Sequence, residues 1–275
     1  MAGAIGLRST PKGQFGNRLL NYLVIRQLAH ELDVGYFSHN PGDRGLIPGI
    51  HRLPFPPLRF RRTVYLERSD VEADGFLERA RQHIARGEVI VPKPRLLANA
   101  YARFDFVDPS RLVRHRFRLC SHHQAVSDGQ PPVVLHLRGK DFATWKEGAV
   151  LGEQYYRDAL EHWEEQQAND FLVRICTDDL DHPALPGLRQ FLRSQGRLMS
   201  PEGCTNPFVC DFAAMMAAPV VVSSPSTFAI TAGLLGTSRA IHSRSWVDAR
   251  IADGEVFWQK VRERSIRSYR VEAEV

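Results

Sequence analysis

The stretch Val133-Val134-Leu135-His136-Leu137-Arg138-Gly139-Lys140-Asp141 decides the fold class of this 275-residue chain. Its first five residues are apolar except for His136, which is typical of a strand buried on both faces of a parallel sheet. Charged residues and a glycine follow at once, so we expect the strand to end with Arg138 at its carboxyl end. Ligands of open α/β sheets bind outside those ends. The stretch therefore predicts a parallel sheet with a binding site that begins at Arg138.

Predicted strands and helices alternate on both sides of this stretch, which favours an α/β fold with parallel sheets. Ahead of it we expect strands at 2–7, 34–38 and 89–91, a helix from about 17 and a helix at 76–86. Residues 39–63 are rich in Pro, Gly and Arg and predict an irregular connection. After the stretch we expect strands at 171–176, 220–222 and 240–242 and helices at 155–167, 185–194, 211–218 and 227–235.

A polar segment, Ser121–Pro132, separates the two halves of this pattern and ends in two prolines, so it is expected to be a linker. We predict two Rossmann-like domains, an N-terminal one at 1–125 and a C-terminal one at 131–260, followed by a tail at 261–275.

The composition is that of a globular protein, with 43% hydrophobic and 24% charged residues, which excludes wholesale disorder. The net charge is +5, and 31 of the 36 basic residues are arginine. Arginine suits phosphate oxygens, although GC-rich codons also produce such an excess. No apolar run approaches the ~20 residues of a membrane span, and the N-terminus carries no run of signal length. The four cysteines form no CxxC pair. We expect a reduced, soluble, cytoplasmic protein.

A glycine loop, Gly13-Gln14-Phe15-Gly16-Asn17, lies between the first predicted strand and helix. Backbone amides at such a junction, together with the positive end of the helix, bind phosphate. The spacing matches neither GxGxxG nor the P-loop pattern. On the loop alone, an ordinary turn with Asn17 as the helix N-cap is the favoured explanation.

Arg138 and His136 lie on the same side of the predicted strand, because side chains alternate along it. A permanently charged guanidinium at a buried strand end needs an anionic partner. That partner is either a protein carboxylate, such as Asp141 or Glu147, or a ligand diphosphate.

Two further strand ends carry polar residues. Thr177-Asp178-Asp179 follows one strand, and we favour a ribose contact or loop capping there over a metal site. Ser223-Ser224-Pro225-Ser226-Thr227 follows another strand and leads into a helix, where hydroxyl and N–H groups form an anion site or an ordinary N-cap. Asp211 is expected to open the preceding helix, either as its N-cap or as an acceptor for a purine base.

Together these segments resemble the fucosyltransferase superfamily, which includes α-1,2-, α-1,6- and protein O-fucosyltransferases. GQFGNRLLNYLVIRQLA resembles the family's N-terminal G-x-x-G-N-Q loop and helix, and HLRGKDF resembles its H-x-R-R-x-D motif. The strand ending in Thr177-Asp178-Asp179 and the segment from Asp211 to Thr227 follow in the family's order. The main departure is Gly139, where many members carry a second arginine.

The resemblance implies a GT-B-like fold of two Rossmann-like domains facing across a cleft, with the acceptor side N-terminal and a GDP-sugar bound by the C-terminal domain. By position, His136 and Asp211 would contact guanine, and Arg138 would hold the diphosphate with Ser226 and Thr227. Asn17 would lie beside the transferred sugar. The other nucleotide-binding candidates are Gly13, Gly16 and Asp178.

The implied activity is an inverting transfer of a sugar, usually L-fucose, from a GDP-sugar to an acceptor hydroxyl on a glycan or small molecule. Arg138 would stabilise the leaving GDP in place of a metal, and Asp141 and Glu147 are the candidate general bases. The alternative is a dinucleotide-dependent oxidoreductase, although the third glycine of its fingerprint is missing. Nucleic-acid binding is not expected, because no basic stripe interleaved with aromatic residues appears. The sequence leaves the oligomeric state open.

Overall fold

The computed structural model describes residues 4–7, 15–38, 62–66, 70, 74–92, 132–145, 149–165, 170–200, 207–224, 226–236, 239–242, 252 and 259. The chain forms two compact units, Met1–Cys120 and Ser121–Val275. The predicted domain limits at 125, 131 and 260 fall outside the described residues.

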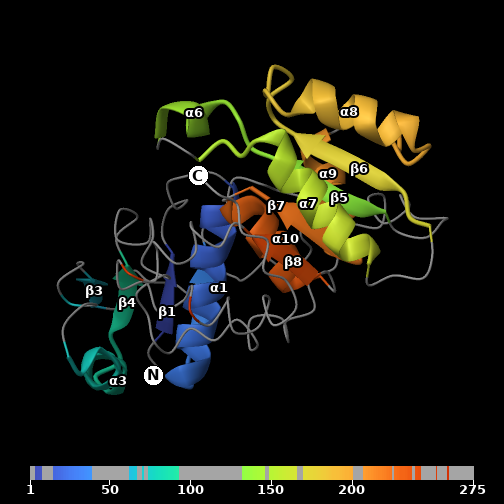
Figure 1. The fold of residues 1–275 in the computed structure, drawn as a ribbon. Coiled ribbons are helices and arrows are strands. Elements are labelled where there is room, and N and C mark those ends of the chain that lie inside the picture. Colours follow the sequence, from blue (N-terminus) through green and yellow to red (C-terminus); the bar gives the residue numbers. More distant parts are fainter. Residues whose placement is uncertain are drawn as a thin grey trace. The chain divides into compact units, whose positions relative to one another are not determined.

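The first unit contains a parallel four-stranded sheet of order β2-β1-β4-β3. Figure 1 labels the strands β1, β4 and β3 of this sheet. Its elements are β1 (Ala4–Leu7), α1 (Phe15–Glu31), β2 (Gly35–Ser38), β3 (Thr63–Leu66), α3 (Phe76–Ala85) and β4 (Val89–Pro92). Leu20, Leu23 and Leu28 of α1 are buried and supply much of its described core. Strand β3 was not expected, and α1 begins two residues earlier than predicted, at Phe15.

The second unit contains a parallel four-stranded sheet of order β6-β5-β7-β8. Its elements are β5 (Val133–Leu137), α6 (Asp141–Trp145), α7 (Glu153–Glu164), β6 (Val173–Thr177), α8 (Leu185–Ser194), α9 (Pro207–Ala217), β7 (Val220–Ser223), α10 (Thr227–Leu235) and β8 (Arg239–His242). The predicted α/β fold with parallel sheets is confirmed, although the short helix α6 was not expected.

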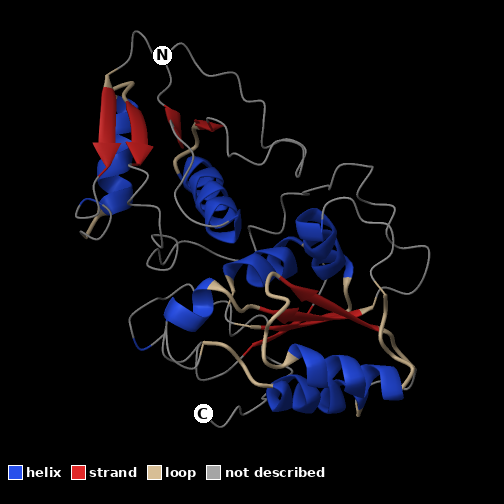
Figure 2. Cartoon of the chain, turned by 90° about the horizontal axis from the view of Figure 1, so that it is seen from above, coloured by secondary structure: helices blue, strands red, loops and turns tan. Residues whose placement is uncertain are grey.

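Helices cover both faces of this second sheet (Figure 2). Leu135 and Leu137 of β5 point to one face and join a buried core with Tyr156 of α7 and Leu188 of α8. His136, which alternates with them, points to the other face and lies 5.9 Å from Phe228 of α10. Strand β5 is therefore buried on both sides, as its nearly continuous apolar run predicted.

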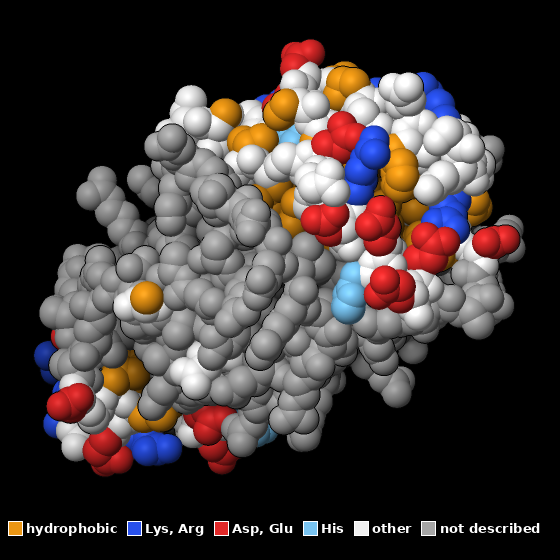
Figure 3. Space-filling model, viewed as in Figure 1, with side chains coloured by type: hydrophobic (Ala, Val, Ile, Leu, Met, Phe, Trp, Pro, Cys, Tyr) orange, Lys and Arg blue, Asp and Glu red, His pale blue; other side chains and the backbone are white. Residues whose placement is uncertain are grey.

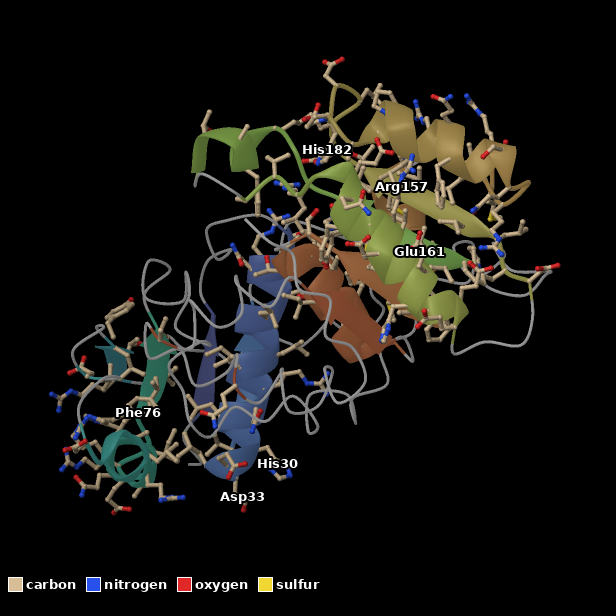
Figure 4. All side chains as sticks on the ribbon, viewed as in Figure 1. His30, Asp33, Phe76, Arg157, Glu161 and His182 are labelled. Carbon is tan, nitrogen blue, oxygen red and sulfur yellow. The ribbon has the colours of Figure 1, made fainter. Side chains whose placement is uncertain are left out.

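Helices α7 and α8 pack together through charged as well as apolar side chains. Arg157 projects from α7 (Figure 4), forms an ion pair with Glu153 and lies with its guanidinium 4.4 Å from the centre of the Phe191 ring on α8. Acidic and basic side chains are interspersed over the described part of the face shown in Figure 3. That visible, described surface carries no broad field of a single sign, which nucleic-acid binding would use.

Candidate functional site

The strand order of the second unit creates a topological switch point. The chain leaves β5 toward β6 on one side and later returns to place β7 on the other side. Connections therefore run in opposite directions from the neighbouring strands β5 and β7, and ligands of open α/β sheets bind outside the carboxyl ends of such a pair. The segments that follow these two ends begin at Arg138 and at Ser224.

Ser224 ties the ends of β5 and β7 together. Its hydroxyl donates to the carbonyl oxygen of His136 at 2.8 Å and accepts from the backbone N–H of Arg138 at 2.8 Å. The Tyr156 hydroxyl lies 2.7 Å from the same Ser224 oxygen. Because Ser224 and Tyr156 are buried, this arrangement holds the backbone that carries Arg138 in one position.

Arg138 is largely buried, with 15% of its side chain exposed, and its Nη1 lies 2.6 Å from Oδ2 of Asp178. Its guanidinium is 5.3 Å from the centre of the Phe142 ring. The sequence analysis named Asp141 and Glu147 as examples of a carboxylate partner, and the structure adds Asp178 as one that was not considered. Asp141 begins α6, its side chain is not described, and Glu147 lies outside the described residues.

The loop after β6 is fastened to the loop after β5. Asp179 Oδ2 accepts from the Lys140 backbone N–H at 2.9 Å, and Asp179 Oδ1 accepts from the Asp181 N–H at 3.1 Å. The Lys140 amide lowers the pKa of the Asp179 carboxyl, although desolvation opposes the shift. A Cβ at Gly139 would lie 1.9 Å from Asp179 Oδ2, so a side chain at this position would displace the Asp179 carboxylate.

Asp211 lies within α9 and does not open it, because the helix begins at Pro207. The expectation that Asp211 is an N-cap is therefore wrong, and proline at the first helical position explains the earlier start. Asp211 Oδ1 instead accepts from Nη2 of Arg174 in β6 at 2.8 Å. Burial raises the pKa of the Asp211 carboxyl, and the bond and charge of Arg174 oppose that rise.

The Phe228 ring beside His136 belongs to an aromatic cluster on this face of the sheet. The Phe228 ring lies 5.0 Å from Phe208 and 5.2 Å from Phe212, both on α9. Phe208 is 40% exposed, whereas His136 is buried. His136 pairs in register with Cys176, which lies two residues after Arg174 and on the same side of β6. The two guanine-contact candidates, His136 and Asp211, thus lie on the same side of the sheet.

Ser226 caps helix α10. Its backbone is extended, and its hydroxyl accepts from the Phe228 backbone N–H at 3.3 Å. Ser226 is buried and Thr227 is half-buried. The structure thus shows Ser226 in the N-cap role that the sequence allowed beside an anion-binding role.

The glycine-loop candidates belong to the first unit. Gly16 and Asn17 lie in the first turn of α1, so Asn17 follows the helix start and does not cap it. Gly13 lies outside the described residues.

No group of three or more His, Cys, Asp or Glu side chains suited to a metal occurs among the residues that the structure describes. Within the same residues, no helix is long and apolar enough to cross a membrane. Cys176 is a free, buried thiol, whereas Cys210 is disulfide-bonded. The expectation of reduced cysteines is therefore wrong for Cys210.

Comparison with solved structures defines the class of fold: the chain has a fucosyltransferase-like fold. Arabidopsis thaliana FUT1 in complex with GDP is 13% identical, and the match covers 88% of this chain and 70% of that chain with a TM-score of 0.55. POFUT1 in complex with GDP-fucose is 11% identical, and the match covers 88% and 98% of the two chains with a TM-score of 0.56. No protein-family model and no curated protein matches the sequence.

Sequence reasoning missed Arg174 and Tyr156, and it placed Ser224 in a hydroxyl segment without its contacts to β5. A signal existed for Arg174, since it is the single charged residue of the strand VRICT. Tyr156 gave no signal, because its hydroxyl contacts residues that are distant in sequence.

Proposed function

We propose that this protein is an inverting glycosyltransferase that transfers a sugar, with L-fucose as the first candidate, from a GDP-sugar to an acceptor hydroxyl. The fold supports a donor of this class, because FUT1 and POFUT1 share it and their structures contain GDP or GDP-fucose. The observation that carries the proposal is Arg138, which stands at the carboxyl end of β5, at the switch point beside β7.

Arg138 and the start of α10 would hold the donor diphosphate. The leaving GDP gains negative charge as the glycosidic bond breaks, and a preorganised guanidinium and helix N-terminus stabilise that charge. Ser226 and Thr227 begin this helix. Such groups supply the electrostatic stabilisation that a metal supplies in other transferases, so we propose that transfer needs no metal.

The ion pair of Arg138 with Asp178 bears directly on this proposal. Asp178 is 31% exposed, so water partly screens its attraction to Arg138 and weakens the ion pair. A diphosphate carries more negative charge than one carboxylate and competes effectively for the guanidinium. We propose that Asp178 holds Arg138 in place before the donor binds.

His136 and Asp211 would contact the guanine base, and Asn17 would lie beside the transferred sugar with the loop of Gly13 and Gly16. A general base must reach the acceptor hydroxyl, and Asp141 and Glu147 are the candidates on the segment after β5. The acceptor would be a glycan or a small molecule.

Replacing Arg138 tests the proposal. We expect Arg138→Ala to lower the transfer rate from GDP-fucose by about 10²–10³-fold and to weaken GDP binding in a calorimetric titration. Arg197→Ala is the matched control, because Arg197 is similarly buried and also pairs with an acid, Glu164. Arg197 follows α8 and bonds to Val173 at the amino end of β6, away from the proposed site. If transfer and GDP affinity both stay within a few-fold of the parent, the assignment of Arg138 is wrong.

Titration with GDP-fucose and GDP-mannose would identify the donor sugar, because the proposed protein contacts read the nucleotide and leave the sugar open. A protein that binds NAD(P)H and ignores GDP would instead favour the oxidoreductase alternative.

A further inference from the structure

Two isolated charges meet in an apolar layer of the second unit. Asp211 is the only charged residue in α9 and α10, and Arg174 is the only one in β6. Arg174 is 5% exposed, and its Nη2 lies 2.8 Å from Asp211 Oδ1. The sequence thus places one acid and one base opposite each other where the surrounding residues are apolar.

Stability alone does not explain this pair. Removing two charges from water costs several kcal/mol per ion, and apolar replacements of buried pairs are often neutral or stabilising. A functional role for one of the two charges, such as contact with a ligand, therefore explains the pair more simply than stability does. The more exposed member is the carboxylate, with 18% of its side chain exposed against 6% for Arg174.

The position of the Asp211 carboxylate suggests contact with a ligand. Asp211 lies one helical turn beyond the exposed ring of Phe208, which stacks on Phe228. Cys176 lies two residues after Arg174, nearer the carboxyl end of β6, and pairs in register with His136 of β5. The carboxylate is thus on the side of the sheet where an aromatic group and a histidine lie close to the carboxyl ends of the strands.

We infer that Arg174 is a positioning residue that orients the Asp211 carboxylate toward the N1–H and 2-amino groups of a purine, so that the protein prefers guanine to hypoxanthine nucleotides. This inference rests on the proposed function, because it takes a GDP-sugar to be the donor. Arg174 binds one carboxylate oxygen and fixes its rotation, and a carboxylate has about four lone-pair sites with which to accept from a base.

Arg174 also keeps Asp211 ionised. Burial raises the pKa of Asp211, and a protonated acid accepts poorly from two N–H donors. The titratable and charged groups on the elements packed around it are Arg174 and Cys176 of β6 and His136 of β5, since α10 and the rest of α9 carry none. Without Arg174, the pKa of Asp211 should rise further.

The test compares GDP with inosine diphosphate, which lacks the 2-amino group, by calorimetric titration of the full chain. A hydrogen bond to a charged group makes the parent protein prefer GDP by about tenfold or more. We expect Arg174→Met to reduce this preference to about twofold or less and Arg174→Lys to restore part of it, because lysine keeps the charge. In Arg174→Met, GDP affinity should also begin to fall at a higher pH than in the parent as the solution is acidified.

The double variant Arg174→Met/Asp211→Asn shows whether Arg174 acts through Asp211. In that case, Arg174→Met changes the GDP preference in the parent but not in the Asp211→Asn background. The double variant removes both buried charges and is expected to fold even if Arg174→Met alone does not. If Arg174→Met does not fold, Arg174→Lys takes its place as the single variant in the comparison. Arg197→Met is the matched control for loss of a paired arginine.

An unchanged GDP preference in folded Arg174→Met, with only a lower melting temperature, overturns the inference and leaves the pair structural. The inference is also overturned if Arg174→Met changes the GDP preference equally in the parent and in the Asp211→Asn background. A parent protein that does not bind GDP at all contradicts the proposed function instead.

Discussion

At the scale of single residues, the site consists of charged groups that are already paired. Arg138 pairs with Asp178, and Arg174 pairs with Asp211. Each pair joins one arginine that follows or lies in a strand to one acid on a neighbouring segment. These pairs keep long side chains in fixed positions before a ligand arrives, which lowers the ordering cost of binding.

The role of Asp178 can be separated from that of Arg138. Arg138 and the Gly139 N–H contact different oxygens of Asp178, so Asp178→Asn keeps an acceptor for one of them and removes one negative charge beside the proposed diphosphate. We expect GDP to bind about two- to fivefold more tightly, as for the loss of a partly exposed charge contact. Calorimetry on this variant and on Asp158→Asn of α7 measures the difference. A tenfold or larger loss would show that Asp178 contacts the nucleotide itself.

His182, in the loop after β6 (Figure 4), is buried, and its Nδ1 accepts from the Ala184 N–H at 3.2 Å. Desolvation lowers its pKa, although Asp179 and Asp178 oppose the shift. Below about pH 6.5 the unfolded chain therefore binds more protons than the folded one. The contribution of His182 to stability is complete above that pH and is lost as the pH falls.

We predict that His182→Asn, which keeps an acceptor for Ala184 but does not titrate, reduces the loss of stability between pH 7 and pH 5. Melting curves across this range measure the effect, with the half-exposed His162→Asn as the control. The same pH dependence in parent and His182→Asn would contradict the prediction.

At the scale of elements, the strand ends of β5 and β7 are held by two side chains from different parts of the unit. Ser224 follows β7 and Tyr156 lies on α7, and both contact the His136 carbonyl oxygen of β5. The site therefore depends on the packing of α7 as well as on the loops. Helix α9 also contributes to the site. A spacing of three and four residues places Asp211 and Phe212 on the same face of this helix as Phe208.

Ser224→Ala tests this arrangement. The change leaves the Arg138 backbone N–H without its acceptor in a buried position, which costs about 1–3 kcal/mol. We expect a lower melting temperature and weaker GDP binding together, because the backbone that carries Arg138 loosens. Ser194→Ala on α8, which removes an exposed hydroxyl bonded to Phe191, is the control and should change neither quantity measurably. Normal GDP binding by Ser224→Ala would show that the hydrogen bonds of the Ser224 hydroxyl do not support the site.

At the scale of the whole molecule, the chain shares its fold with FUT1 and POFUT1 at 13% and 11% identity. Each unit contains a parallel four-stranded sheet, and in the second unit the connections change direction at the central pair, β5 and β7. A fold of this kind supports many chemistries, so activity has to be argued from the site.

A ligand that binds only the folded chain raises its stability in proportion to the logarithm of its concentration. We predict that GDP at about 100 times its dissociation constant stabilises the protein by about 2.7 kcal/mol, whereas NAD(P)H has no effect. Thermal denaturation with GDP, UDP and NAD(P)H measures this difference. Stabilisation by NAD(P)H alone would favour the oxidoreductase alternative.

Several elements follow from local sequence. The bounds predicted for β5, α8 and α10 agree with the structure, because each has a clear apolar pattern with polar or glycine residues at its ends. The start of α9 was predicted four residues late, since its first turn is apolar and resembles a buried segment of any kind. Helix α6 is only one turn long and gives no periodic signal.

The amino-acid sequence by itself determined the parallel α/β fold and placed Arg138 at a strand end, because hydrophobic periodicity and glycine positions act over a few neighbouring residues. Only the tertiary structure decided which groups meet. Arg174 and Asp211 are 37 positions apart, and Arg138 and Ser224 are 86 apart. Such contacts depend on which strands become neighbours in the sheet, and the order β6-β5-β7-β8 results from the packing of whole elements, so that no local pattern contains it.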